Sequence, residues 1–352
     1  MTKINPRKNI AAMKAYVPPL EGRRSGSNLL LDFNERTMPP SKEVVAALQK
    51  FAQEGNLQIY PEYNPLIEKL SAFINTDRDY LMLSNGSDNA IDTAFRTYLS
   101  KGDKIIIPQP SFTMFAHSAN LQEAEILTPS YTFENGYPLK EVKELLKTQQ
   151  VKICVICNPN NPTGSMLDQE DIQILLGENK QVLFLIDEAY FEFINETSLP
   201  LVQTNENVIV TRTFSKAMGI PALRFGYLLA QPSLINEMIK VRGPYAVNMM
   251  SVTAAMTSID HQTDVSTYVD EVMNISKPMM EMFYQSKNIN FWPSGCNFHL
   301  IEKPIDNLDE KLAEKNIRVR DMKYPGYENT IRISIGTKED TEKILAVLNS
   351  IL

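Results

Sequence analysis

The sequence predicts an α/β protein: a three-layer large domain with a mostly parallel sheet between helices, and a smaller α/β domain beside it. Three observations predict this fold. Four short segments are almost continuously apolar, which is typical of strands buried on both faces. Segments with apolar residues at helical spacing lie between them, and this alternation forms parallel units. The length of 352 residues indicates more than one small core.

The predicted elements follow one another along the first two-thirds of the chain. The first pair is the helical segment 87–102 and the strand KIIIP at 104–108. The others are, in chain order, the helix 138–149, the strand 151–159, the helix 167–180 and the strands 182–190 and 207–215. Parallel sheets bind ligands beyond the carboxyl ends of their strands, so the segments that follow these strands are the first candidates for a site.

The two ends of the chain differ from this central part. Residues 1–37 are rich in Pro, Gly and Arg, and we expect an arm that belongs to the smaller domain. We expect residues 38–245 to form the large domain. Residues 246–352 are expected to form the small C-terminal domain, an α/β layer that ends in the helix KEDTEKILAVLNSIL.

The composition excludes several classes of protein. Hydrophobic residues make up 43% and charged residues 22%, as in globular proteins. A net charge of −7 without a Lys/Arg tract argues against a nucleic acid as partner. No apolar run reaches the roughly 18 residues that span a bilayer, and the first residues lack the apolar core of a signal peptide. We therefore expect a cytoplasmic protein with no membrane partner.

The cysteines and histidines indicate no metal or redox site. An odd count of three cysteines argues against a disulfide scaffold. Cys154 and Cys157 lie on one predicted strand, where residues three apart point to opposite faces, so we interpret them as buried apolar residues. The histidines have no metal-ligand spacing, and we expect no metal. Neither a GxGxxG after a strand nor a P-loop is present.

Two polar stretches contain candidates for anion and ring binding. Gly86 and Ser87 stand where a helix is expected to begin, and a helix N-terminus presents free N–H groups that can hold a phosphate. The simpler alternative is that Ser87 or Asp88 caps the helix. The stretch CNPNNPTG at 157–164 closes a buried strand with turn residues and directs Asn161 into the crevice.

Two further stretches contain an acid and a lysine. Asp187 follows the apolar part of the strand 182–190, where a carboxylate needs a partner, either a structural cation or a ligand. Lys216 follows the strand 207–215, with Thr213 and Ser215 before it and Arg224 eight residues after it. It could be an exposed loop lysine, or a nucleophile whose proton is lost near neutral pH through desolvation or nearby positive charge.

Taken together, these stretches match what pyridoxal 5'-phosphate requires. This cofactor needs a lysine that forms a Schiff base, an acid against its pyridine nitrogen and a cradle for its phosphate. All four stretches are expected at the same edge of one sheet. The acid has to be ionised to keep the ring nitrogen protonated, which lets the ring withdraw electrons from the substrate.

The sequence resembles the fold-type I, class I/II pyridoxal-phosphate aminotransferases over nearly its whole length, and within them the histidinol-phosphate aminotransferases. The resemblance rests on NPNNPTG, on DEAY at 187–190, on the lysine with its following arginine, and on RISIGT at 332–337. Their order and approximate spacing are those of the family. The resemblance implies a transaminase that takes an amino donor and a 2-oxo acid.

The resemblance also implies roles for individual residues. Lys216 would bind the cofactor covalently and then move a proton, and Asp187 would pair with the pyridine nitrogen. Tyr190 and Asn161 would hydrogen-bond the 3-oxygen of the ring, and Phe112 would stack on it, where the family often has tyrosine. The phosphate would be held by the N-terminus of the helix and by hydroxyl and guanidinium groups, which are contributed by Gly86, Ser87, Asp88, Thr213, Ser215 and Arg224.

Other roles concern a second subunit and the substrate. Tyr60 matches a tyrosine that reaches the cofactor phosphate of the partner, so the resemblance implies a homodimer. Tyr16 and Asn34 fall where the family contacts substrate. Arg332 matches the arginine that takes a carboxylate, and Arg320 matches the one that histidinol-phosphate aminotransferases add beside it. Two segments depart from the family pattern, NERTMPP at 34–40 and GIPALRFG at 219–226.

The residues leave several functions open. The first is transamination between histidinol phosphate and 2-oxoglutarate in histidine biosynthesis. The others are a lyase similar to threonine-phosphate decarboxylase, and an aminotransferase for an aromatic or another phosphorylated amino compound. A cofactor-binding module without catalysis, such as the effector domain of a transcription regulator, would need a DNA-binding segment. The short arm has no helix-turn-helix pattern to supply one.

Overall fold

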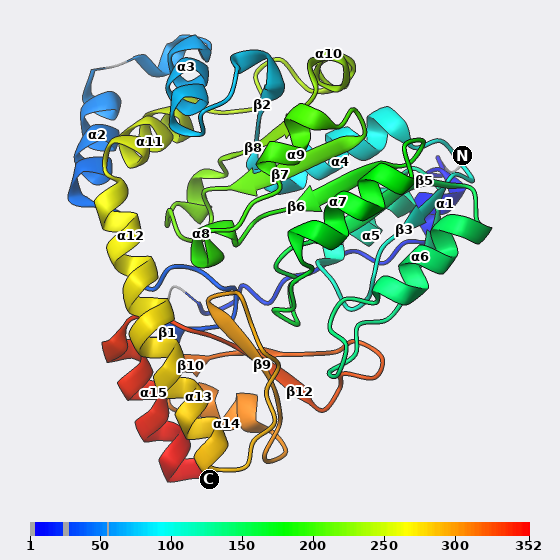
Figure 1. Cartoon of the computed structure of the whole chain (residues 1–352). Coiled ribbons are helices and arrows are strands. Elements are labelled where there is room, and N and C mark those ends of the chain that lie inside the picture. The colour runs from blue at the N-terminus through cyan, green and yellow to red at the C-terminus, as the bar shows by residue number, and fades with distance from the viewer. Residues whose placement is uncertain (1–3, 24–27, 55) are drawn as a thin grey trace.

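A computed structural model describes residues 4–23, 28–54 and 56–352 of the chain. Its main sheet has seven strands in the order β2-β8-β7-β6-β5-β3-β4 (Figure 1). Only β8 runs antiparallel to its neighbours in this sheet. The strands are β2 (Leu81–Ser84), β3 (Lys104–Ile106), β4 (Glu125–Leu127), β5 (Val151–Cys157), β6 (Leu183–Asp187), β7 (Val208–Thr213) and β8 (Gly226–Ala230).

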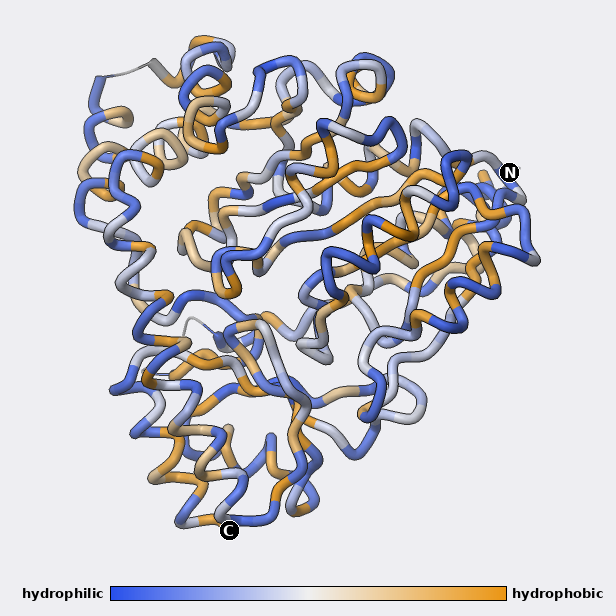
Figure 2. The backbone as a smooth tube through the Cα atoms, viewed as in Figure 1, coloured by the Kyte–Doolittle hydropathy of each residue, from blue (hydrophilic) through white to orange (hydrophobic). Residues whose placement is uncertain are grey.

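Two apolar layers cover the sheet, because successive side chains of each strand point to opposite faces. Cys154 belongs to one layer and Cys157 to the other, as the sequence predicted, and both are buried free thiols. The tube in Figure 2 shows the strands as apolar segments between helices of mixed character. One layer includes residues of α4 (Gly86–Tyr98), α5 (Thr113–Leu121) and α10 (Pro232–Val241). The other includes residues of α3 (Asn64–Phe73), α6 (Leu139–Thr148), α7 (Gln169–Glu178) and α9 (Leu199–Thr204).

The four predicted strands and the helices before them are confirmed, with shorter ends. The segment predicted at 182–190 leaves the sheet after Asp187, because the chain turns there and the short helix α8 (Phe191–Ile194) begins. The helix predicted at 87–102 begins at Gly86 and ends at Tyr98, after which Leu99 is extended. The sequence prediction did not include β2, β4 and β8.

A second, three-stranded sheet lies below the main one in Figure 1, in the order β11-β12-β9. Its strands are β9 (Phe298–Glu302), β11 (Arg320–Asp321) and β12 (Thr330–Ser334), and it packs on α13 (Lys277–Ser286), α14 (Leu308–Glu314) and α15 (Lys338–Ile351). A capping box between Thr337 and Asp340 starts α15, because each side chain bonds the other's backbone N–H.

Two connections join the parts of the chain. The helix α12 (Gln262–Glu271) continues through a π-helical stretch, Val272–Ser276, into α13, and together they run past both sheets (Figure 1). Before it, α11 (Met249–Asp260) packs on α2 (Lys42–Gln53) and α3. Near the N-terminus, after the short helix α1 (Lys8–Ala12), β1 (Leu29–Leu30) pairs in parallel with β10 (Ile317–Arg318). The boundaries at residues 37 and 245 stay a prediction.

No helix in the described ranges is long and apolar enough to cross a membrane. These ranges also contain no cluster of three metal-ligating side chains.

Candidate active site

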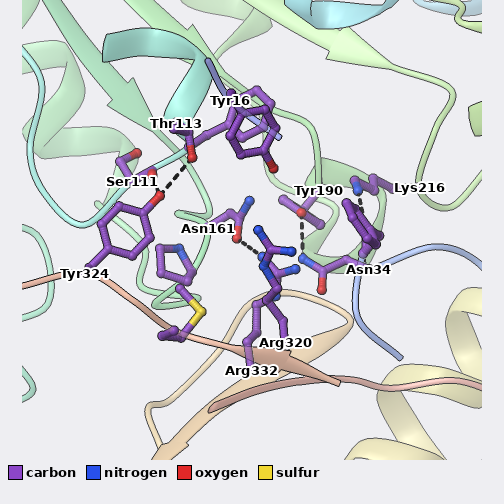
Figure 3. Close-up of a pocket in the computed structure, with 14 residues that line it drawn as sticks. Tyr16, Asn34, Ser111, Thr113, Asn161, Tyr190, Lys216, Arg320, Tyr324 and Arg332 are labelled. Carbon is purple, nitrogen blue, oxygen red and sulfur yellow. Dashed lines mark hydrogen bonds between the residues drawn. The ribbon is translucent and has the colours of Figure 1, made fainter. Parts of the chain in front are cut away.

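A cavity of about 1140 Å³ opens at the carboxyl ends of the main strands. It brings together most of the residues that the sequence singled out: Tyr16, Ser87, Asp88, Phe112, Asn161, Asp187, Tyr190, Thr213, Ser215, Lys216 and Arg224. A second cavity of about 110 Å³ shares several of these residues, and Asn34, Arg320 and Arg332 also line it (Figure 3). Tyr60 lines neither cavity.

Two glycines bring the N-terminus of α4 close to the strand beside it. Gly86 has a φ of +76°, and a Cβ there would lie 2.5 Å from Nη2 of Arg224. A Cβ on Gly226 would lie 2.7 Å from the backbone N of Ser87. Neither Ser87 nor Asp88 is the N-cap: Asn85 occupies that position without a side-chain cap bond. The first N–H groups of α4 therefore remain available to an anion.

Hydroxyl and guanidinium groups gather beside this helix end. Thr213 Oγ1 donates to Ser215 Oγ at 2.9 Å, and Arg224 Nη1 lies 3.5 Å from the same oxygen. Arg224 also pairs with Asp88 at 3.0 Å and remains partly exposed. Its left-handed backbone, with a φ of 58°, follows the short 3-10 helix Pro221–Leu223. This set of donors has the chemistry of a phosphate cradle.

Asp187 is a buried carboxylate, 2% exposed, at the end of β6. Thr211 Oγ1 donates to its Oδ1 at 2.8 Å, and Cys157 Sγ lies 4.0 Å from its Oδ2. Burial raises the pKa of Asp187 to about 7. A structural ion pair does not explain this acid, because its neighbour Glu188 makes the buried ion pair, at 2.9 Å to Arg212. Asp187 faces the cavity instead, where a cation would favour its ionised form.

Lys216 lines both cavities, so it is not an exposed loop lysine. Its Nζ donates to the backbone oxygen of Phe33 at 2.9 Å. Loss of water around the amine lowers the pKa of Lys216 to about 8, and the positive charge of Arg332 acts in the same direction. A larger fraction of this amine is therefore neutral at neutral pH than of an ordinary lysine.

The second cavity has a buried arginine at its base. Arg332 is 8% exposed and donates from Nη2 to the backbone oxygen of Asp32 at 2.6 Å and from Nη1 to Asn161 Oδ1. Burial lowers the pKa of Arg332. Arg320 lies directly opposite it in the β11–β12 pair, and Figure 3 shows both side chains reaching toward the cavity. Within the described residues neither arginine forms an ion pair with a carboxylate.

Tyr190 and Asn161 have protein partners at the same place. Asn34 Nδ2 donates to the Tyr190 hydroxyl at 2.9 Å, and Ser334 Oγ donates to Asn34 Oδ1 at 3.0 Å. Burial raises the pKa of Tyr190 far above its ordinary value. Tyr190 and Asn161 thus connect the larger cavity to the smaller one, which both of them also line.

The comparisons with known proteins agree with this geometry. Residues 26–348 match the family described as aminotransferase class I and II. The chain belongs to this family. It is 32% identical to histidinol-phosphate aminotransferase 1 of Trichormus variabilis, over 98% of each chain. It is 34% identical to a dihydroxyacetone phosphate transaminase of Campylobacter jejuni, over 94% of this chain and 93% of that one.

A solved structure has the same fold. The histidinol-phosphate aminotransferase of Sinorhizobium meliloti, in complex with pyridoxal 5'-phosphate, superposes with a TM-score of 0.89 at 21% identity, covering 100% of this chain and 99% of that one. This likeness shows the fold-type I architecture. The cofactor, pyridoxal 5'-phosphate, follows from membership in the aminotransferase class I and II family. The cavity of this aminotransferase fits that group: Gly86 and Gly226 leave room at a cradle of donors, and a buried acid faces the same space as a desolvated lysine.

Sequence reasoning missed two side chains of the aminotransferase that support the site. Arg36 belongs to the departure NERTMPP, and its fully buried side chain pairs with Asp264 at 2.9 Å and donates to the backbone oxygen of Ala217 at 3.4 Å. It thus supports the loop of Lys216 from behind. Tyr324 lines the smaller cavity from the loop between β11 and β12. The departure itself was a signal for Arg36, whereas no pattern singles out Tyr324.

Proposed function

We propose that this aminotransferase transfers the amino group of an amine that bears a phosphomonoester to 2-oxoglutarate. Histidinol phosphate is the first candidate donor, which would place the enzyme in histidine biosynthesis. The observation that carries this proposal is the pair Arg320 and Arg332. These two residues lie opposite each other on β11 and β12, and both line the smaller cavity, which Lys216 also lines.

The charge of this pair favours a phosphate. A phosphomonoester carries close to two negative charges at neutral pH, and the two guanidinium groups form no ion pair with a carboxylate among the described residues. Charge-assisted hydrogen bonds contribute about 1.5–3 kcal/mol each, so a dianion gains more here than a carboxylate does. Both relatives named above carry a phosphate compound in their names, which supports the same class of substrate.

The remaining residues would hold the cofactor. The phosphate group would lie at Gly86, Ser87, Asp88, Thr213, Ser215 and Arg224. Phe112 would stack on the ring, Asp187 would face its nitrogen, and Tyr190 and Asn161 would face its 3-oxygen. When bound, pyridoxal 5'-phosphate supplies an aldehyde that reacts with amines and a ring that withdraws electrons from the carbon beside the nitrogen.

Lys216 would serve first as an amine that is displaced by the donor and then as a base. Its lowered pKa, about 8, leaves its Nζ able to accept a proton near neutral pH and to return it. The Phe33 carbonyl, 2.9 Å away, would hold this amine in place. Tyr16 and Asn34 would contact the substrate from the N-terminal segment.

The first prediction concerns Arg320. We expect Arg320→Ala to reduce the preference for histidinol phosphate over histidinol, measured as the ratio of kcat/KM values, by about tenfold or more, because one charge-assisted bond is lost. Arg318→Ala is the matched control, since Arg318 lies two residues earlier in the chain, on β10, and lines neither cavity. Equal kcat/KM values for both amines in the unaltered enzyme would contradict the proposal.

Two other activities would fit the same cavity. The C. jejuni relative points to the amine that corresponds to dihydroxyacetone phosphate, that is, a phosphorylated aminopropanediol. A lyase similar to threonine-phosphate decarboxylase would release carbon dioxide. Each candidate substrate, namely histidinol phosphate, the phosphorylated aminopropanediol and threonine phosphate, is assayed with 2-oxoglutarate. A transaminase forms glutamate from its donor, whereas the lyase releases carbon dioxide from threonine phosphate.

We further propose that the enzyme is a cytoplasmic homodimer in which Tyr60 acts on the cofactor phosphate of the other subunit. Tyr60 is 74% exposed, stacks on Tyr245 at a centroid distance of 4.4 Å, and lines neither cavity of its own chain. Leu57 and Ile59 beside it are exposed as well. A second subunit would bury this apolar surface.

A subunit-mixing experiment tests Tyr60. We expect Lys216→Ala and Tyr60→Phe subunits, each impaired alone, to regain activity when they exchange, because each mixed dimer then has one site with both residues. Random exchange would restore about a quarter of the unaltered activity.

Mixing Lys216→Ala with Asp187→Asn is the control for this exchange. Both of these residues belong to the same chain's site, so that mixture should regain no activity. If subunits exchange, as followed by mass spectrometry, and the Tyr60→Phe mixture still gains nothing, Tyr60 does not act across subunits.

A further inference from the structure

Tyr324 connects the two parts of the site. Its hydroxyl donates to the backbone oxygen of Ser111 at 3.1 Å and shares a hydrogen bond with Thr113 Oγ1 at 2.9 Å. Figure 3 shows this hydroxyl pointing at both groups from the loop that joins β11 to β12. Ser111 and Thr113 are the residues before and after Phe112, so one side chain contacts both flanks of the ring that faces the larger cavity.

The segment around Phe112 has other polar supports at this end, among them the Ser111 N–H, which donates to Gln109 Oε1 at 3.3 Å. Ser111 Oγ donates to Asn160 Oδ1 at 2.8 Å, and Asn160 Nδ2 donates to the backbone oxygen of Pro110 at 3.0 Å. These bonds come from the same domain as Phe112. Tyr324 supplies the bonds from the other side, from the loop between β11 and β12. These two strands contain Arg320 and Arg332.

We propose that Tyr324 is a positioning residue that couples the arginine pair to Phe112. By bonding both neighbours of Phe112, its hydroxyl fixes the ring against the cofactor and fixes the β11–β12 hairpin at the distance that the substrate requires. The part that concerns the hairpin rests on the proposed function of the arginine pair. The part that concerns Phe112 depends only on the cofactor.

The same loop contains a matched control. The Tyr327 hydroxyl donates to the backbone oxygen of Tyr131 at 2.7 Å, so it also joins the loop to the large domain. Tyr131 is buried in the core, and neither Tyr131 nor Tyr327 lines either of the two cavities. Tyr327→Phe therefore removes a comparable bond from the same loop without touching the flanks of Phe112.

The test compares Tyr324→Phe, Thr113→Val and Tyr327→Phe. Equilibrium dialysis of each apoprotein with pyridoxal 5'-phosphate gives the Kd of the cofactor. We expect Tyr324→Phe and Thr113→Val to raise this Kd by about fivefold to tenfold, the range of one net hydrogen bond. Their combination should be no worse than Tyr324→Phe alone, because that substitution already removes the bond to Thr113. Tyr327→Phe should leave the Kd unchanged and only lower the Tm.

Kinetics supply the second readout. Tyr324→Phe should raise the KM for the phosphorylated donor by about tenfold and change kcat by less than about twofold, since the reacting groups stay in place. A cofactor Kd equal to that of Tyr327→Phe, or additive effects of the two substitutions, would overturn the proposal. The dialysis uses no amino donor, so its result stands even if the donor carries no phosphate; in that case only the KM effect would be absent.

Discussion

Replacement of Lys216 by alanine is expected to abolish transamination, by about 10⁴-fold or more in kcat, because the variant loses both its nucleophilic amine and its base. No other group can replace it easily: the amine is held by the Phe33 carbonyl, and desolvation keeps its pKa at about 8. Reduction of the unaltered holoenzyme with borohydride, followed by peptide mass spectrometry, should locate the pyridoxyl group on Lys216.

Lys180 provides the control for this substitution. It is an exposed lysine after α7 that donates to Asn205 Oδ1, and Lys180→Ala should keep full activity and the same labelled peptide. Lys216→Ala should retain the circular dichroism spectrum of the unaltered protein. Turnover above a trace in Lys216→Ala, or a pyridoxyl group on another lysine, would contradict the assignment.

Substitution of Asp187 by asparagine has the second-largest expected effect. The variant should still bind the cofactor through its phosphate cradle, but kcat should fall by about 10²–10³-fold. The reason is that a neutral amide cannot hold the ring nitrogen protonated, and a loss of two to three pKa units of stabilisation corresponds to about this factor. Steady-state kinetics at saturating cofactor measure it. Near-normal turnover would mean that Asp187 has only a structural role.

The apoprotein gives an independent readout of the same substitution. Burial raises the pKa of Asp187 in the folded state to about 7, above its unfolded value. The carboxyl therefore destabilises the folded apoprotein increasingly as the pH rises from about 4 to 7, and the penalty is complete above that range. Apo Asp187→Asn should have a higher Tm than the unaltered apoprotein at pH 8 and nearly the same Tm near pH 4. A lower Tm at pH 8 would contradict this account.

Sequence patterns predicted the site best for residues at the carboxyl ends of parallel strands. Asn161, Asp187 and Lys216 all follow parallel strands, so their convergence at one edge of the sheet follows from the fold class. The pairing of Arg320 with Arg332 needed more, because only the hairpin places residues twelve apart directly opposite each other. The strands could be predicted because burial on both faces makes their sequences almost continuously apolar. The residues at which they end could not be predicted in the same way, because turns and caps depend on local hydrogen bonds.

The residues that sequence patterns missed come from irregular segments. Phe33 contributes a backbone carbonyl, which any residue could supply, and Tyr324 lies in a loop without periodicity. Arg36 reaches the Lys216 loop from 181 positions away. Such contacts depend on tertiary packing, and neither hydrophobic period nor spacing encodes them.

The bonds between Asn34 and Ser334 also have a consequence for the order in which the molecule can be assembled. These residues are 300 positions apart, and Arg332 bonds Asp32 across the same separation. On the ribosome, the segments from β2 to β8, which supply the phosphate cradle, emerge long before β12. The N-terminal segment of a nascent chain must therefore wait for almost the entire remaining synthesis before it finds its partners. The two ends of the site thus mature at different times, with the cofactor end available first and the substrate end last.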